Sequence, residues 1–256
     1  MVVMNLTYFD SNSWLIEIDA RRILLDPWLV GELTFSDASW LFRGKKNNPQ
    51  PIPEDIDLIL LSQGLEDHAH PPTLKKLDKQ IPVVASPNAA KVVKELGYTT
   101  VTTLNHEESF KLGENVLIKA VPGSPIGPTL TENGYIIKGL NSDKSIYYEP
   151  HGYHDKSLKE IAPIDVIITP IISLKLPIIG AAIKGQNAAL QVCKWLNPQV
   201  ILSTAAGGDI DFKGLLMSIL KADGTVEEFN RLLEKNNIST KAIDPQSGET
   251  IELSLV

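Results

Sequence analysis

Histidines and carboxylates occur together in two short polar segments of the sequence. The first is Glu66-Asp67-His68-Ala69-His70 and the second is Glu149-Pro150-His151-Gly152-Tyr153-His154. Each follows an apolar run typical of a strand, so each is expected in a loop at a strand end. Imidazole and carboxylate groups bind divalent metals and exchange protons near neutral pH. Polar loops also contain histidine for no chemical reason, so the two segments alone leave both interpretations open.

Other familiar catalytic motifs are missing from the sequence. The segment Ala205-Ala206-Gly207-Gly208-Asp209 lacks the Lys-Ser/Thr of a P-loop and the spacing of a dinucleotide site, and is typical of a tight turn. No Gly-x-Ser-x-Gly elbow occurs, so a serine hydrolase has no support. The single Cys193 lies in an apolar periodic segment, which favours a small buried side chain over a reactive thiol.

The composition is typical of an acidic globular protein. The chain has 256 residues, of which 43% are hydrophobic, and a formal net charge of -7 at pH 7. We therefore expect one domain over residues 1–256 and no nucleic-acid partner. The apolar runs between Val166 and Ile183 are broken by Pro170, Lys175 and Pro177 and are too short for a membrane span. With no signal peptide expected and only one cysteine, the cytoplasm is the expected location.

Short apolar runs separated by turn residues predict the strands. They are Leu6 to Phe9, Trp14 to Ile18, Ile23 to Leu25, Leu58 to Leu61, Val116 to Val121, Tyr135 to Ile137, Ile146 to Tyr148, Val166 to Thr169 and Val200 to Ser203. Helices are expected from Pro71, from Pro87 to Gly97, and near Ala188 to Leu196 and Val226 to Asn236. Two successive halves of strands with helices favour a layered α/β sandwich.

Two further segments predict an apolar approach to the strand ends. The long connection Leu29 to Gln50 is expected to be a surface insertion or lid, and Leu176 to Ile183 carries no charge until Lys184. The insertion and its approach contribute the large side chains Trp28, Leu29, Phe35, Trp40, Leu41 and Phe42. Together the segments could line a groove for an apolar small-molecule ligand. Core packing or a contact in an oligomer is the alternative use of these side chains.

Several segments, in order over most of the chain, resemble the metallo-β-lactamase superfamily, particularly its branch of ascorbate-phosphate-lactonase-like and related metal-dependent hydrolases. They are Ile23-Leu24-Leu25-Asp26-Pro27-Trp28, Ile56-Asp57-Leu58-Ile59-Leu60-Leu61-Ser62 running into Glu66-Asp67-His68, Ala120-Val121-Pro122, Ser145-Ile146-Tyr147-Tyr148, Ile164-Asp165-Val166 and Ser247-Gly248-Glu249. The resemblance implies a four-layer αββα sandwich, in which two sheets face each other, helices lie outside, and metals bind at one edge.

The metal-binding signature of that family is largely rewritten in this chain. The signature is His-x-His-x-Asp-His after a strand that ends in Ser or Thr. Aligned on Ser62, it puts Gln63 and Leu65 where the first two histidines belong. Asp67 and His68 then remain as its last two residues.

The later ligands of the family are also changed. The region of its third histidine is Pro122-Gly123-Ser124-Pro125, which contains no imidazole. His151 stands at or beside its bridging aspartate, and the run from Ile201 to Ala206 supplies no last histidine. The first metal position therefore has too few donors, and the usual dizinc centre is not expected.

The residues that remain imply one metal-ligand set, formed by Asp67, His68 and His151. Two imidazoles and a carboxylate leave open positions for water and substrate, and the expected ion is one divalent metal, zinc or manganese. In the alternative interpretation, Asp67 caps the helix that begins at Pro71 or accepts loop hydrogen bonds, and His68 pairs with it as a buried polar relic.

The other polar residues near these loops receive separate assignments. Asp67 and Glu149 are the candidate catalytic carboxylates, with Glu149 as a general base or, alternatively, as an ion-pair partner of a histidine. His70 and His154 could supply an additional metal ligand. His106 is expected at a solvated turn and is left out of the site.

Two functions of different classes follow from this site. The first is a hydrolase-like enzyme with a remodelled, single-metal centre that acts on an ester, lactone, amide or phosphoester. The second is a catalytically inactive member of the fold that binds a small molecule or a protein. The metal content of the purified protein distinguishes the two, because only the first requires a bound transition metal.

Overall fold

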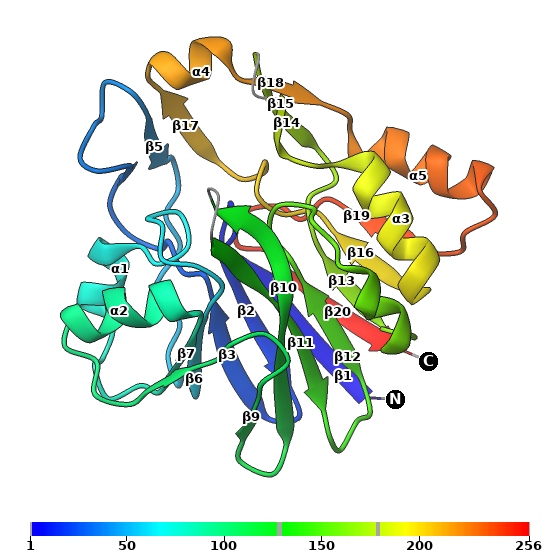
Figure 1. Cartoon of the computed structure of the whole chain (residues 1–256), viewed down its shortest axis with the longest axis horizontal. Coiled ribbons are helices and arrows are strands. Elements are labelled where there is room, and N and C mark those ends of the chain that lie inside the picture. Colours follow the sequence, from blue (N-terminus) through cyan, green and yellow to red (C-terminus); the bar gives the residue numbers. More distant parts are fainter. Residues whose placement is uncertain (1, 127–129, 178–179, 256) are drawn as a thin grey trace.

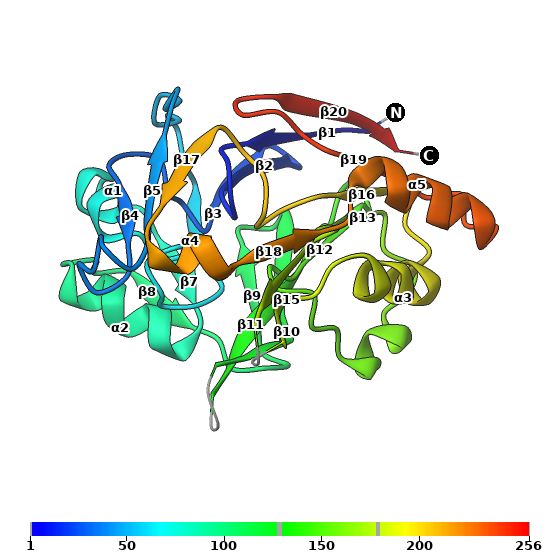
Figure 2. The same cartoon turned by 90° about the horizontal axis from the view of Figure 1, so that it is seen from above.

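Two facing sheets form the centre of the molecule in the computed structural model, which describes residues 2–126, 130–177 and 180–255 (Figures 1 and 2). The first sheet contains, in spatial order, β20 (Thr250–Leu255), β1 (Val2–Tyr8), β2 (Trp14–Ile18), β3 (Arg21–Leu25), β6 (Leu58–Leu61), β7 (Val83–Ala85) and β8 (Val101–Thr103). The second contains β19 (Lys241–Ile243), β16 (Val200–Leu202), β13 (Val166–Ile168), β12 (Ser145–Tyr148), β11 (Leu130–Gly139), β10 (Val116–Ile126) and β9 (Ser109–Leu112).

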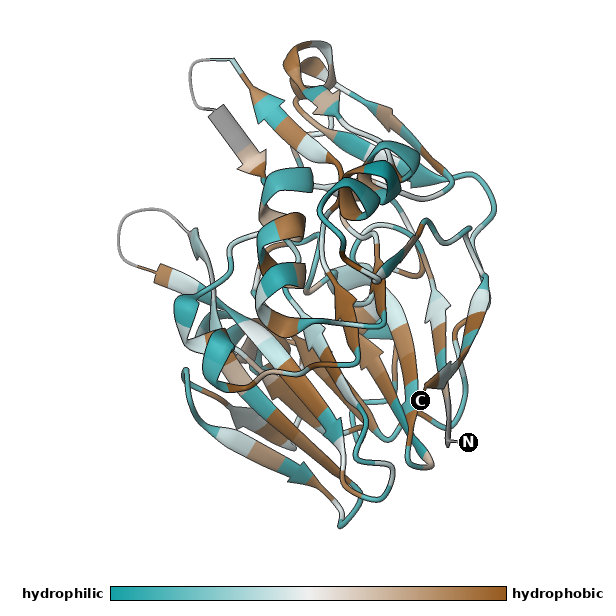
Figure 3. Ribbon diagram, turned by 90° about the vertical axis from the view of Figure 1, so that its right-hand side faces the viewer, coloured by the Kyte–Doolittle hydropathy of each residue, from teal (hydrophilic) through white to brown (hydrophobic). Residues whose placement is uncertain are grey.

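The hydrophobic core lies between these sheets and is built by the alternation of side chains along each strand. Ile16 of the first sheet and Ile118 and Ile146 of the second belong to one buried cluster. In β20 the alternation is regular, since Ile251 and Leu253 are buried and the residues between them are exposed. Figure 3 shows the hydrophobic residues concentrated on the strands of both sheets.

Helices cover the outer face of each sheet. α1 (Pro71–Lys76) and α2 (Pro87–Glu95) pack on the first sheet, while α3 (Gln186–Leu196), α5 (Val226–Lys235) and the 3-10 helix η1 (Lys156–Glu160) pack on the second. The predicted αββα sandwich is therefore confirmed. Cys193 lies on α3 and is buried, as expected for a small apolar side chain. None of the described helices is long and apolar enough to cross a membrane.

Two small sheets stand over the sandwich, and the sequence predicted neither. One pairs β4 (Leu33–Thr34) and β5 (Arg43–Lys46) with β17 (Ile210–Lys213), and the other pairs β14 (Ser173–Leu176) with β15 (Gly180–Ile183) and β18 (Lys221–Asp223). The short helix α4 (Leu215–Ile219) joins them. In the first of these sheets, β5 and β17 pair although more than 160 residues separate them in the sequence. No local sequence pattern can show such a pairing. The assignment of residues 1–256 to one domain stays a prediction.

The parallel strands of both sheets end at the same edge of the sandwich. β3 runs parallel to β6 in the first sheet, and β12 runs parallel to β13 in the second. The residues that follow them, Asp26 after β3, Ser62 after β6 and Glu149 after β12, are polar and buried. The edge beyond the carboxyl ends of parallel strands is the usual place for a ligand site in such sheets.

Candidate metal centre

Asp26 connects the two sheets at this edge. Its backbone adopts a left-handed conformation (φ 40°), which is uncommon for a residue other than glycine. The buried side chain accepts hydrogen bonds from the Ser62 backbone N–H at 2.8 Å and from the Tyr148 hydroxyl at 2.6 Å. Ser62 follows a strand of the first sheet and Tyr148 ends a strand of the second, so a single carboxylate holds both strand ends.

His68 is completely buried between two carboxylates. Its Nδ1 lies 2.7 Å from Asp26 Oδ2, and its Nε2 lies 3.2 Å from Asp67 Oδ2. Burial alone would lower the pKa of His68, but the charges of Asp67 and Asp26 outweigh it and hold that pKa well above its usual value. The two carboxylates therefore favour a proton on the ring in the metal-free protein, and a cation bound at Nε2 would take the place of that proton.

His151 is held in a similar way from the second half of the chain. Its Nδ1 lies 2.6 Å from Oε1 of Glu132, a buried residue of β11. The same Oε1 accepts a hydrogen bond from the Ser124 backbone N–H at 3.2 Å. The rings of His151 and His68 lie 5.2 Å apart, centroid to centroid. With Nδ1 engaged by Glu132, Nε2 is the ring nitrogen that remains for a ligand.

The predicted ligand set is brought together by the fold. One donor atom from each of Asp67, His68 and His151 lies within 4.8 Å of the other two. Asp67 Oδ1 has no hydrogen-bond partner, although it is buried. A buried oxygen without a partner beside two imidazoles fits a cation, which would satisfy it. The donor set of two nitrogens and one carboxylate suits zinc or manganese.

Glu149, Glu132 and His151 form a second group of possible metal ligands. One donor atom from each of the three lies within 4.8 Å of the other two. Glu149 Oε2 accepts hydrogen bonds from the backbone N–H groups of Tyr153 at 2.7 Å and His151 at 3.3 Å. Burial, together with the charge of Glu132, raises the pKa of Glu149 well above its usual value. Its predicted role as a general base stays a prediction.

His70 and His154 do not join the cluster. Nδ1 of His70 lies 3.0 Å from the Thr73 hydroxyl and Nε2 lies 3.1 Å from the Glu32 carbonyl, so the chain itself occupies both ring nitrogens. His70 also caps α1, the role that the alternative interpretation gave to Asp67. His154 pairs with the Tyr147 hydroxyl at 3.1 Å and lines a separate, smaller cavity.

The sequence predicted a solvated turn at His106; the structure has a turn there, with part of the side chain shielded from solvent. The side chain is half-buried, and Nε2 lies 3.1 Å from the backbone carbonyl of Glu132. The turn packs against β11 next to the site. The polar neighbours Glu107 and Glu108 suggested that His106 is exposed to solvent. Its partial burial comes from β11, a strand that lies further along the sequence.

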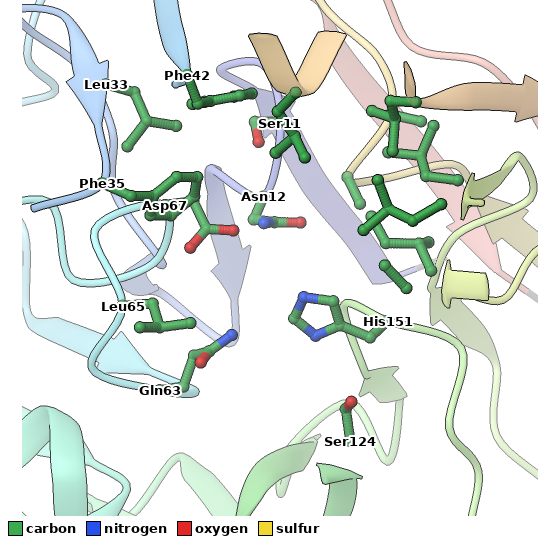
Figure 4. Close-up of a pocket in the computed structure, with 18 of the residues that line it drawn as sticks. Ser11, Asn12, Leu33, Phe35, Phe42, Gln63, Leu65, Asp67, Ser124 and His151 are labelled. Carbon is green, nitrogen blue, oxygen red and sulfur yellow. The ribbon is translucent and has the colours of Figure 1, made fainter. Parts of the chain in front are cut away.

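A cavity of about 720 Å³ opens above the metal centre. Figure 4 shows Asn12, Asp67 and His151 near the middle of the view, between Phe42 above and Ser124 below. As expected, the insertion and the apolar segment both line it, with Phe35 and Phe42 on one side and Leu176 and other side chains on the other. Other large side chains of the insertion do not line the cavity. Trp28 and Leu29 are buried core residues, and Trp40 is 70% exposed. Of the apolar segment, Ile178 and Ile179 lie outside the described residues.

The comparison with known families agrees with this geometry. A family model described as "Beta-lactamase superfamily domain" matches residues 5–205. The chain belongs to the beta-lactamase superfamily. It is 24% identical to a UPF0173 metal-dependent hydrolase of Thermodesulfovibrio yellowstonii, over 97% of this chain and 91% of that protein. The resemblance that the sequence predicted, to the metal-dependent hydrolases of the superfamily, is therefore confirmed.

Several solved structures share the fold. The metallo hydrolase Igni18 of Ignicoccus hospitalis has 17% identity and a TM-score of 0.69, covering 98% of this chain and 99% of that one. An isothiocyanate hydrolase from Delia radicum gut bacteria has 17% identity and a TM-score of 0.71, covering 99% and 100%. CmlA, a diiron β-hydroxylase of Streptomyces venezuelae, has 15% identity and a TM-score of 0.68, covering 98% and 54%. The fold alone therefore does not decide the reaction.

The residues that our alignment puts at the missing histidines of the superfamily lie around the same cavity. Gln63, Leu65, Ser124 and Pro125 all line it. Gln63 Oε1 has no hydrogen-bond partner, and Leu65 is 43% exposed. The carboxylate of Glu132 lies against Ser124, in the region to which the resemblance assigns the third histidine.

Sequence reasoning missed Asp26 and Glu132, the two carboxylates that hold the histidines. Asp26 was noted as part of a family marker but received no role. Glu132 gave a weak signal, since it is a charged residue at the start of the apolar run that includes Tyr135 to Ile137. A carboxylate next to a buried strand is a candidate partner for a buried histidine, but the strand pairing decides which one it meets.

Proposed function

We propose that this protein is a hydrolase with a single divalent metal, zinc or manganese, held by Asp67, His68 and His151. The observation that supports it most strongly is the carboxylate on Nδ1 of each histidine, Asp26 for His68 and Glu132 for His151. Histidines that bind metal through Nε2 commonly donate their other N–H to a carboxylate, which fixes the tautomer and the ring orientation.

The metal would supply a polarised substrate oxygen and a water molecule of lowered pKa. The side chains of the protein then bind and orient the substrate and exchange protons with it or with water. Asp67 lines the cavity, and its carboxylate oxygen that does not bind the metal can accept a proton from water that enters. Asn12 Oδ1 and Gln63 Oε1 are without partners and line the same cavity, so they can orient the polar part of a substrate. The proposed substrates contain an ester, lactone, amide or phosphoester bond.

A second candidate function is binding without catalysis. The largely apolar walls of the 720 Å³ cavity support it, since such a cavity can hold a small molecule whether or not a metal is present. This candidate predicts purified protein free of metal, with the imidazolium of His68 satisfied by Asp26 and Asp67 alone.

The experiment that tests the proposal is metal analysis of protein purified without added metal, for the unmodified chain and for His151→Ala. We expect close to one zinc or manganese per chain, and a severe loss of metal in the variant because it removes one of three ligands. His154→Ala is the matched control, because His154 lies in a different cavity. Metal-free unmodified protein, or equal metal content in His151→Ala, would favour the binding protein.

A further inference from the structure

The cavity has no cationic side chain among the described residues that line it. Its titratable groups are Asp67, Glu132 and His151 at the polar end and the Tyr153 phenol. Lys184 lies over the Tyr153 ring at 3.6 Å, but it lines the separate smaller cavity and not this one. In the metal-free protein, an anionic ligand would therefore meet two carboxylates and no lysine or arginine, which proteins usually provide for phosphate or carboxylate.

The walls of the cavity are apolar on both sides. The residues that form them share aliphatic or aromatic side chains and come from the insertion, from β17 and α4, and from the small sheet of β14, β15 and β18: Leu33, Phe35, Phe42, Phe212, Leu216, Met217, Leu174, Leu176, Ile183 and Ala222. Leu65 continues this surface to the polar end, beside Asp67. An apolar substrate group can therefore begin next to the reacting bond.

We infer that the cavity selects an uncharged substrate, in which a long or bulky apolar group is attached to an ester, lactone or amide carbonyl, and discriminates against phosphoesters. The reacting bond rests on the proposed function, whereas the selectivity of binding does not. Hydrolysis breaks the acyl C–O or C–N bond, and water gives its hydroxyl to the acyl carbon and a proton to the leaving oxygen or nitrogen. The volume of about 720 Å³ suits a drug-sized molecule.

The binding test uses metal-free protein, so that it does not depend on catalysis. A fluorescent apolar probe, 1-N-phenylnaphthylamine, is displaced by decanamide, by its shorter homologues and by decyl phosphate. We expect decanamide to bind at least about tenfold more tightly than decyl phosphate, and each methylene to change affinity by about three- to fourfold. Equal or tighter binding of decyl phosphate, or no binding of either compound, would contradict the inference.

A charge introduced into the wall sharpens this test. Leu174→Lys places an ammonium group in the cavity. We expect this change to weaken the binding of decanamide and to strengthen the binding of decyl phosphate. Leu140→Lys makes the same change at an exposed position that does not line the cavity, and it should leave both affinities unchanged. A Leu174→Lys variant that binds both compounds like the unmodified protein would show that they bind elsewhere.

Hydrolysis gives the second readout. Protein loaded with zinc or manganese is assayed with 4-nitrophenyl decanoate, 4-nitrophenyl acetate and 4-nitrophenyl phosphate. We expect the decanoate to have the highest kcat/KM and the phosphate the lowest, and the reverse order would overturn the inference. Preference for decanamide in a protein that takes up no metal would support the selectivity of the cavity and refute the proposed hydrolysis.

Discussion

The two halves of the chain each contribute one histidine to the centre, but they hold it differently. His68 is completely buried and has a carboxylate at each ring nitrogen, Asp26 at 2.7 Å and Asp67 at 3.2 Å. His151 is partly exposed to the cavity and has one carboxylate partner, Glu132 at 2.6 Å. The first arrangement also ties the two sheets together, whereas the second joins β11 to the loop after β12 within one sheet. A change at Asp26, which holds His68, should therefore act mainly on stability, and a change at Glu132, which holds His151, should act mainly on the metal.

The largest effect is expected from Asp26→Ala. This substitution leaves the buried imidazolium of His68 without one of its two charged partners and removes the hydrogen bonds to Ser62 and Tyr148. Breaking a buried pair by removing one partner costs about 3–5 kcal/mol of unfolding free energy. Urea unfolding of the metal-free protein measures this cost. A loss below about 1 kcal/mol would remove the distinction between the halves.

A matched control for this change is Asp57→Ala. Asp57 also accepts hydrogen bonds from two positions, the Arg21 guanidinium at 2.9 Å and the Arg22 backbone N–H at 2.8 Å. Both side chains of the Asp57–Arg21 pair are partly exposed. Since exposed pairs contribute about 0–1 kcal/mol, we expect a correspondingly small loss of stability.

The second prediction concerns Glu132→Gln. Glutamine keeps the size of the side chain but not the charge that fixes His151, so metal affinity should fall by about 10- to 100-fold. Thermal stability should change little, because the substitution also removes a buried charge beside Glu149. Competition with a metal chelator measures the affinity, and thermal melting measures the stability. A large loss of stability with unchanged metal affinity would make Glu132 a structural residue.

The contrast also shows what the sequence can and cannot predict. The strand runs and the order of the family markers predicted the αββα sandwich, because hydrophobic alternation and strand-end polarity are local properties. Asp67, His68 and His151 could be named for the same reason, since each lies in a short polar segment after a strand. Asp26 and Glu132 received no role, because their importance comes from distances across strands and sheets. The pairing of β5 with β17 was missed for the same physical reason.

A smaller effect is expected from Glu149→Gln. If burial keeps the Glu149 carboxyl group protonated, a neutral amide of the same shape should lower the rate of hydrolysis by less than about threefold. A general base at this position predicts a loss of about 100-fold or more, since proton transfer contributes that much. Steady-state rates of the metal-loaded variant on 4-nitrophenyl decanoate separate these outcomes and test the candidate catalytic role directly.

The last effect concerns the pH dependence of stability at His154, which lies outside the centre. Burial lowers the pKa of His154 to about 3, below the value of about 6.5 expected for the unfolded chain. The unfolded chain therefore binds the proton first, and the contribution of His154 to stability is complete above pH 6.5 and is lost as the pH falls. Between pH 6.5 and 5 the unmodified protein should lose about 1.5–2 kcal/mol more than His154→Gln. Equal losses in urea unfolding would contradict this assignment.

The central claim is that one metal is bound by ligands from both halves of the chain. Crystals of protein loaded with zinc or manganese, measured by anomalous scattering at the absorption edge of the metal, test it most directly. The account predicts one peak at the edge of the sandwich, bound by Asp67 and by Nε2 of both His68 and His151. Two peaks a few ångströms apart with protein ligands to each, or no peak near these residues, would contradict it.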